Sequence, residues 1–227
     1  MGASHEEQQI SAIGMLVTIT AVQVVASFTV LATPAALPAA NLLPGMQSGF
    51  LALHTSIIFG LGGVTSLMMG NVLSLMNGLR ASQLCMGLAV FGMALTVSGT
   101  WWLMLCGAVF IGLSYGMPAA AAAQVFAQVE FGRRRNMVFS VRQSGVPAGG
   151  ALAGFLVAPA AAYLGWHWAI SFVACVPLVL IFVLGRVETR FRPAGSGNTG
   201  AKPAAPPMSA VAVLRTVPSY LPLYGVG

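Results

Sequence analysis

The chain has 227 residues, of which 57% are hydrophobic and only 6% are charged. Soluble domains average about 25% charged residues, because a water-facing surface needs them. The composition therefore excludes an ordinary soluble domain and predicts an all-α integral membrane protein. Cys85, Cys106 and Cys175 stand far apart in apolar runs. Their spacing fits neither a metal-binding motif nor a disulfide framework, and we expect no metal and no cofactor.

The first apolar run is predicted to be a retained transmembrane helix. Residues 1–9 carry two acids and no Lys or Arg, unlike the basic start of a cleaved signal peptide. We interpret them as a cytoplasmic N-terminus. Six apolar segments follow, each near the ~20 residues that cross a bilayer core. They cover about 10–33, 47–69, 82–99, 101–124, 143–163 and 168–185 within a six-helix region over 10–186.

All ten Lys and Arg residues fall on one side of this map. They lie between the second and third segments, between the fourth and fifth, and after the sixth, whereas the opposite loops hold none. The positive-inside rule makes the charged side cytoplasmic. The tryptophans independently mark the outer interface, where indole rings prefer to lie: Trp101, Trp102, Trp166 and Trp168. We therefore expect a multi-pass protein of the inner (plasma) membrane, and no nucleic-acid partner for the GRRR run at 132–135.

The segment after the sixth span changes character. Residues 187–209 include a stretch rich in Pro, Gly, Ala and Ser, which is typical of a flexible linker, here a central cytoplasmic one. Residues 210–227 become apolar again, which predicts the start of a truncated seventh span. We therefore expect the chain to be a fragment of a longer protein.

Three motifs resemble the N-terminal six-helix half of the major facilitator superfamily. The loop NVLSLMNGLRASQL (71–84) resembles the family motif GxLaDrxGrk, with Leu73, Gly78 and Arg80 in register with its Leu, second Gly and last basic position. LGWHWAISF (164–172) is similar to the GWRW-type junction. SVRQSGVPAGGALAG (140–154) resembles the fifth-helix signature RQ(T/S)GVPxGGALAG of bacterial cyanate and small organic-anion permease-like members.

The resemblance implies two inverted three-helix repeats that form one half of a twelve-helix bundle. It also implies alternating access around a central site, with a C-terminal six-helix half as partner. Three positions depart from the family pattern. Asn71 and Leu75 replace the Gly and Asp of the loop motif, so its usual acid–base latch is absent or rebuilt. Ala108 stands where proton-coupled members often carry Arg, which speaks against a standard proton-antiport mechanism.

Polar side chains inside spans are candidate substrate-binding residues, because burying them in a membrane is costly. Arg142 heads the fifth predicted span beside Gln143, and a guanidinium binds carboxylate-like anions through paired hydrogen bonds. The alternative for Arg142 is an interfacial anchor that snorkels to the headgroups. His54 is either a proton-coupling group or a hydrogen-bonded pore-lining residue. Gln23 and Gln124 lie in the first and fourth helices, which line the cavity in the family.

Small residues at helical spacing predict close helix packing that still allows conformational change. The fifth segment carries Gly145, Gly149, Gly150 and Gly154, and the fourth carries Gly112 and Gly116. Pro147 is predicted to lie in the first turns of the fifth helix, where the missing N–H costs least.

These features favour a secondary active transporter of a small solute, more specifically an organic anion, with a coupling ion as a further partner. The anion preference rests on Arg142 and on the lack of carboxylates in the spans. A non-transporting scaffold or accessory subunit is the main alternative, and a half-size homodimer is a variant of the transporter. An enzyme is not expected, because the spans hold no HExxH motif, carboxylate pair or Ser–His arrangement.

The predicted topology can be tested with single cysteines after the three native ones are replaced by alanine. Thr100→Cys, in an outer loop, should react with a membrane-impermeant maleimide in intact cells. Ser196→Cys, in the predicted cytoplasmic linker, should react only after the membrane is permeabilised. The reverse pattern would contradict the N-in topology.

Overall fold

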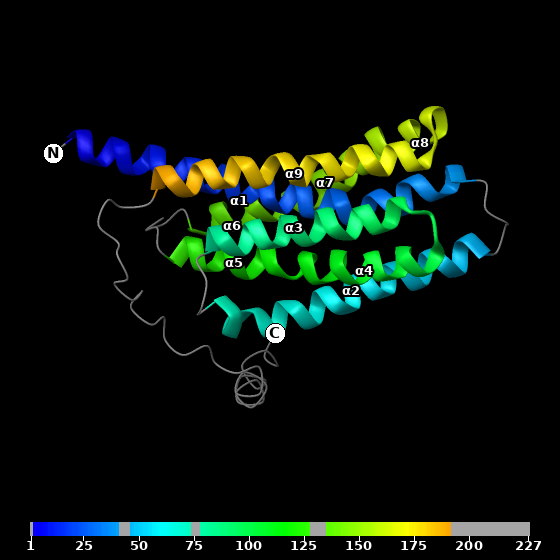
Figure 1. The fold of residues 1–227 in the computed structure, drawn as a ribbon. Coiled ribbons are helices and arrows are strands. Elements are labelled where there is room, and N and C mark those ends of the chain that lie inside the picture. Colours follow the sequence, from blue (N-terminus) through cyan, green and yellow to red (C-terminus); the bar gives the residue numbers. More distant parts are fainter. Residues whose placement is uncertain (1, 41–45, 74–77, 128–134, 192–227) are drawn as a thin grey trace, which may run out of the picture.

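The computed structural model describes residues 2–40, 46–73, 78–127 and 135–191, and this part is almost entirely helical (Figure 1). The long helices lie side by side as a bundle. In chain order the elements are α1 (Gly2–Ala36), η1 (Leu37–Ala40), α2 (Met46–Leu73), α3 (Gly78–Val97), α4 (Trp101–Tyr115), α5 (Met117–Ala127), α6 (Arg135–Gln143), α7 (Gly145–Leu152), the π-helical turn η3 (Ala153–Val157), α8 (Ala158–Leu164) and α9 (Trp166–Phe191).

Six helical stretches in the described part are long and apolar enough to cross a membrane. They are Ile13–Ala36, Gly49–Met69, Gly78–Val97, Trp101–Ala123, Asn136–Leu164 and Trp166–Val187. Their lengths match the ~20 residues that a bilayer core requires. The sequence-based prediction of six apolar membrane-crossing helices is thereby confirmed at the level of length and composition.

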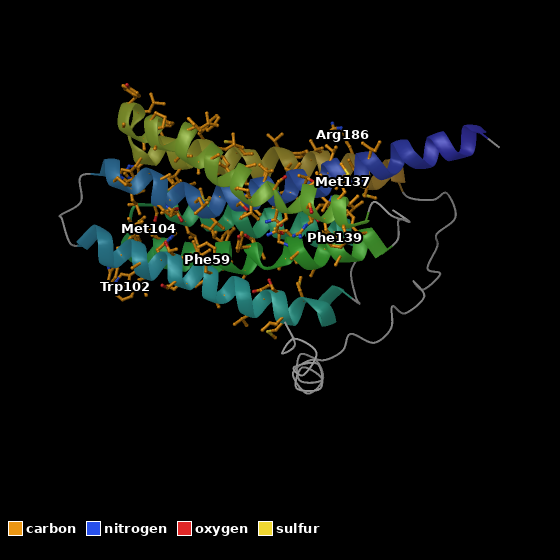
Figure 2. All side chains as sticks on the ribbon, turned by 180° about the vertical axis from the view of Figure 1, so that it is seen from behind. Phe59, Trp102, Met104, Met137, Phe139 and Arg186 are labelled. Atoms are coloured by element: carbon orange, nitrogen blue, oxygen red, sulfur yellow. The ribbon has the colours of Figure 1, made fainter. Side chains whose placement is uncertain are left out.

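The aromatic and basic residues at the helix ends separate along the bundle. Trp102 lies near one end of the helices and Arg186 near the other (Figure 2). The turn after α3 and the start of α9 meet at the Trp-bearing end, since a Cβ built on Gly99 would lie 3.0 Å from His167 Nε2 and 3.5 Å from the Trp166 ring. Gly99 has a φ of +73°, which favours glycine in this tight turn. The two predicted outer turns therefore share one end of the molecule.

The fourth span is divided at Gly116 into α4 and α5. Pro118 has no N–H and cannot donate to the Ser114 carbonyl one turn earlier, which interrupts the helical hydrogen-bond ladder. The Cys85 thiol on α3 donates to this carbonyl oxygen instead, at 3.1 Å. Cys85 is therefore more than an apolar packing residue, because its thiol also donates to a backbone oxygen beside the interruption.

Glycines bring α4 within backbone contact of α2. A Cβ built on Gly112 would lie 2.9 Å from the Ile58 carbonyl oxygen. One built on Gly116 would lie 2.5 Å from the Gly62 carbonyl oxygen and 2.6 Å from Thr65 Cβ. Ser66 Oγ also donates to the Gly116 carbonyl at 3.0 Å. The predicted packing role of Gly112 and Gly116 agrees with this geometry.

The fifth membrane helix begins earlier than the sequence suggested. Helix α6 starts at Arg135, whereas the predicted segment starts at residue 143. The intervening sequence RNMVFSVR mixes polar and apolar residues, so its average hydrophobicity is too low to indicate a membrane helix. In the structure, Val138 and Arg142 lie on the buried face of this helix, and Met137 and Val141 are exposed. Pro147 therefore lies well inside the helical stretch. Its missing N–H explains the interruption at Ser144 between α6 and α7.

The third membrane helix also begins before its predicted start at residue 82. Gly78 is the first residue of α3 and is buried, and Arg80 lies in the first turn with an exposed side chain. Both residues of the loop motif thus belong to the helix rather than to the connection. Leu73 is the last residue of α2, and its side chain lies outside the described part.

Gly116→Ala is expected to destabilise the α2–α4 contact, because the new methyl group would collide with backbone atoms rather than with a flexible side chain. The free energy of unfolding should fall by about 1–3 kcal/mol. Gly63→Ala on α2 is the matched control, since a Cβ there meets nothing within 4 Å. Thermal unfolding in detergent measures both, and equal midpoints for the two variants would contradict the packing assignment.

Candidate functional site

Arg142, in the last turn of α6, is buried although it carries a permanent charge. Only 7% of its surface is exposed, and its Nη2 donates to Gln23 Oε1 on α1 at 2.6 Å. A snorkelling side chain would extend to the membrane surface and remain exposed. The interfacial-anchor interpretation of Arg142 is therefore wrong, because its guanidinium turns into the protein.

Gln23 connects Arg142 to a third polar residue, Ser27. Gln23 is 5% exposed, and its Nε2 lies 3.4 Å from Ser27 Oγ, a long hydrogen bond within α1. Ser27 is 1% exposed. Sequence analysis did not single out Ser27, although its place one helical turn after Gln23 puts the two on the same face. Arg142, Gln23 and Ser27 form a buried polar group, which we call the Arg142 cluster.

Glycines on α7 make room for this cluster. Gly145 and Gly149 follow Arg142 by three and seven residues, on the same helical face. A Cβ on Gly145 would lie 3.2 Å from both Cβ and Cγ of Gln23, so the glycine leaves space for the Gln23 stem to cross toward Arg142. A Cβ on Gly149 would lie 2.5 Å from the Val24 carbonyl oxygen and 2.7 Å from Ser27 Cβ. Backbone-to-backbone packing of α7 on α1 therefore holds the cluster in place.

The other two glycines of the fifth segment behave differently. A Cβ on Gly150 would meet only the Leu31 Cδ1 methyl at 3.0 Å, a flexible group that can shift. Gly154 is exposed, and a Cβ there meets nothing within 4 Å. The expected close packing at Gly154 is wrong for the described helices. Gly154 lies nine residues after Gly145, which at about 100° per residue places it on the opposite face of the helix.

Gln143 and Pro147 are exposed, whereas Arg142 is buried. Neighbouring residues on a helix point about 100° apart, so Gln143 and Arg142 face different surroundings. The structure does not bring Gln143 into the Arg142 cluster. A role for Gln143 in binding stays a prediction.

His54 on α2 is fully buried, at 0% exposure, and lies next to the Phe50 ring with centroids 5.8 Å apart. Neither ring nitrogen has a hydrogen-bond partner among the described residues. The expectation of a hydrogen-bonded, pore-lining histidine is therefore not met in this part of the chain. Gln124 belongs to α5, but its side chain lies outside the described residues.

The charge of Arg142 is uncompensated within the six spans. The chain has four acids, Glu6, Glu7, Glu130 and Glu188, and all lie outside the described membrane stretches. Gln23 and Ser27 are neutral. In addition, the buried Arg142 Nε–H has no acceptor within the described part of the chain. A buried positive charge with an open donor can bind one oxygen of an anion, which would supply both the missing acceptor and the missing charge.

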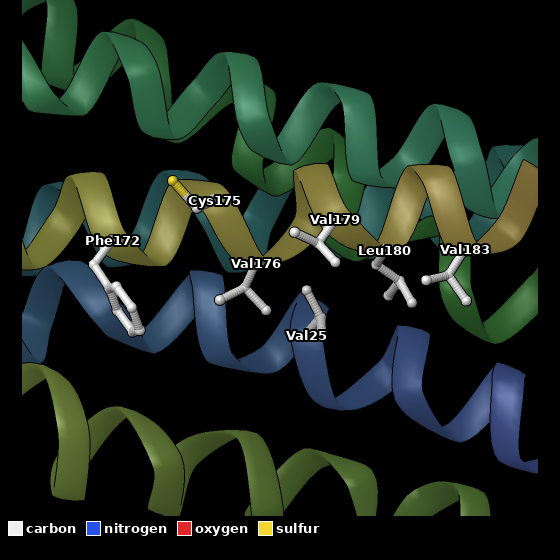
Figure 3. Close-up of a pocket in the computed structure, with 7 residues that line it drawn as sticks. All are labelled: Val25, Phe172, Cys175, Val176, Val179, Leu180 and Val183. Atoms are coloured by element: carbon white, nitrogen blue, oxygen red, sulfur yellow. The ribbon is translucent and has the colours of Figure 1, made fainter.

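A groove between α1 and α9 has different chemistry (Figure 3). Its volume is about 380 Å³, and its wall is formed by Val25, Phe172, Cys175, Val176, Val179, Leu180 and Val183. None of these described lining residues has a charged or amide side chain. Such a groove suits hydrocarbon and cannot orient a polar solute. Candidate solute chemistry is therefore found at the Arg142 cluster rather than in this groove.

No protein-family model matches the chain, and no curated protein matches it. Among the described residues, no three His, Cys, Asp or Glu side chains gather where they could hold a metal ion.

Gln23→Met keeps the side-chain volume and removes the acceptor of the Arg142 Nη2 proton. We expect this change to lower the free energy of unfolding by about 1.5–3 kcal/mol, the range for a lost hydrogen bond to a charged group. Gln143→Met is the matched control and should change it by less than about 0.5 kcal/mol, because the side chain is exposed. Denaturation of both variants in detergent measures this. A Gln23→Met protein as stable as the control would contradict the assigned hydrogen bond between Arg142 and Gln23.

Proposed function

We propose that the chain forms one half of a secondary active transporter of the major facilitator type, and that this transporter carries small organic anions. One observation carries the proposal: a buried arginine with an open Nε–H and no carboxylate in the surrounding spans. A buried charge is expensive when nothing completes it. An anionic solute completes it, and Arg142 is the residue that we assign to anion binding, with Gln23 and Ser27 as its positioning partners.

The pattern of helix contacts supports an internally repeated half. The six spans can be divided into two groups of three, in which the first span corresponds to the fourth, the second to the fifth and the third to the sixth. A contact between the first and fifth spans is then equivalent to a contact between the fourth and second. A contact between the first and sixth spans is equivalent to one between the fourth and third. Both pairs exist: α1 packs on α7 and α2 on α4, while α1 packs on α9 and α3 on α4. The third–sixth pair, α3 and α9, is its own equivalent and is also in contact. Inverted repeats in transporters place solute sites where such units meet, near the bilayer midplane.

A scaffold or accessory subunit explains the Arg142 cluster less well. Buried polar groups in a membrane are costly and mark solute or ion pathways far more often than passive packing. A passive bundle could place a leucine at residue 142 and pack at least as well. A transporter therefore explains the buried Arg142 cluster, whereas a scaffold has no function for it.

Uptake into proteoliposomes by the full-length protein tests the proposal. Labelled cyanate, formate, acetate and glycolate are suitable probes, measured under conditions where their uncatalysed leak is subtracted. Arg142→Gln should reduce carrier-mediated uptake about a hundredfold, because it removes the charge from a buried site. Arg142→Lys keeps the charge but loses the planar fork, so uptake should fall by an intermediate factor.

Arg186→Gln is the control, since Arg186 is an exposed arginine near the other end of α9 from the Trp-bearing turn. Its uptake should equal that of the wild type. The proposal fails if none of the four anions is carried, or if Arg142→Gln carries them as fast as the control.

A further inference from the structure

We propose that the groove between α1 and α9 binds one anionic phospholipid, whose acyl chain lies in the groove and whose phosphate contacts Arg186. Both walls of the groove and the arginine belong to described residues of this chain. The lipid site is separate from the anion carrier proposed above and does not depend on it.

The wall of the groove is apolar along its whole length. Six of its seven residues belong to α9, and Val25 supplies the α1 side (Figure 3). Phe172 and Val179 are large and apolar, yet they are 60% and 61% exposed. Water solvates such a surface poorly, whereas an acyl chain covers it without breaking any hydrogen bond. The groove is therefore suited to hydrocarbon.

The groove lacks the small residues through which helices of this bundle meet. Gly112 and Gly116 lie against the α2 backbone, and Gly149 lies against the α1 backbone. Helix contacts in membranes favour such residues, because they let two backbones approach closely. The described lining of the groove holds no glycine, alanine or serine. Its shape therefore fits a thin, flexible chain better than another helix.

The groove has about the length of one bilayer leaflet. Its α9 wall runs from Phe172 to Val183, which at 1.5 Å per residue is about 16 Å. The hydrocarbon core of a bilayer is about 30 Å thick, so each leaflet contributes about 15 Å. The Val183 end points toward the end of the bundle where Arg186 lies (Figure 2). One acyl chain of the leaflet on that side therefore matches the groove in length.

Arg186 places a positive charge beyond the end of the groove. It follows Val183 by three residues and Val179 by seven, a spacing that keeps all three on one face of α9. Its side chain is exposed, and the apolar stretch ends at Val187, which is the depth expected for a lipid headgroup. A guanidinium binds phosphate oxygens through paired hydrogen bonds, and its five N–H groups can serve more than one partner. The phosphate of a lipid whose chain fills the groove therefore meets a positive charge.

The sequence around Arg186 favours an anionic lipid over a zwitterionic one. Arg190 and Arg192 follow it, against a single acid, Glu188. Arginines next to a membrane helix attract the anionic lipids of the cytoplasmic leaflet, and the charge map predicts that this side is cytoplasmic. Phosphatidylglycerol brings one negative charge, whereas phosphatidylcholine adds a positive charge that cancels it. Phosphatidylglycerol is therefore the better match.

The groove and the Arg142 cluster lie on different faces of α1. Val25 follows Gln23 by two residues, which turns it about 200° around the helix. Loss of the lipid should therefore leave the solute site in place. The expected uptake by Arg186→Gln stays that of the wild type, and the lipid site and the anion carrier can be tested independently.

Native mass spectrometry of the full-length protein in detergent tests the lipid site. The protein is titrated with phosphatidylglycerol and, separately, with phosphatidylcholine that has the same acyl chains. We expect the wild type to bind phosphatidylglycerol at least about fivefold more tightly, the factor for one basic residue near a membrane surface.

Charge variants test the headgroup contact. Arg186→Gln should lower the affinity for phosphatidylglycerol about fivefold and leave the affinity for phosphatidylcholine unchanged. Arg80→Gln is the matched control, because Arg80 is an exposed arginine in the first turn of α3 and the groove is lined by α1 and α9. It should bind both lipids like the wild type.

Groove variants test the acyl-chain contact. Val179→Trp fills the groove and should lower the affinity for both lipids about tenfold, which corresponds to about two displaced methylene groups. Leu178→Trp is the matched control, since Leu178 is exposed on the same helix but does not line the groove. Both positions are exposed, so both variants should unfold at the wild-type temperature.

Three results would overturn the lipid site. The first is equal affinity of the wild type for the two lipids, or an Arg186→Gln protein that binds phosphatidylglycerol as tightly as Arg80→Gln does. The second is a Val179→Trp protein that binds both lipids like Leu178→Trp. The third is no binding of either lipid, which would mean that another part of the protein covers the groove. Each of these leaves the anion carrier in place.

Discussion

The organisation of this bundle depends on one interaction: a positive charge held between two membrane helices by a neutral amide. Arg142 reaches Gln23 at 2.6 Å, and the charge has no partner of opposite sign in the described spans. Burying such a charge in a membrane interior is costly, so the arrangement depends on the positions of the groups around Arg142. The close approach of α7 to α1, the interruption at Ser144 and the stem of Gln23 all lie within two turns of this contact.

Proline and glycine shape the bundle where two helices must come close. Pro118 and Pro147 interrupt the fourth and fifth spans, and each interruption lies next to a pair of glycines that touches another helix. At the first, the Cys85 thiol donates to the Ser114 carbonyl oxygen. These are the places where a helix can bend at little cost, because neighbouring side chains already satisfy its backbone. The interruption near Pro147 is thus part of the same interface with α1 as the polar site, whereas the one near Pro118 belongs to the contact with α2.

The number and type of the membrane helices could be predicted from the sequence, because they depend on hydrophobicity averaged over long segments. Twenty apolar residues in a row predict a membrane helix almost regardless of order. Sequence analysis missed the first turns of the fifth span, because an amphipathic helix such as α6 has low average hydrophobicity. It could place Gln23 and Arg142 among the candidates but not together, because 119 residues separate them and only tertiary packing joins them. Gly154 lies nine residues after Gly145, so ordinary helical geometry places the two on opposite faces, and the i, i+4 pairs of glycines do not form one face.

The central claim is that the open donor of Arg142 faces an anion rather than a protein carboxylate. A crystal structure of the full-length protein with bromoacetate tests this most directly, because bromine is located by anomalous scattering. The account predicts a bromine peak beside Arg142, with a carboxylate oxygen within hydrogen-bond distance of Nε. An Asp or Glu from elsewhere in the protein bonded to that Nε, with no bromine at the site, would contradict it.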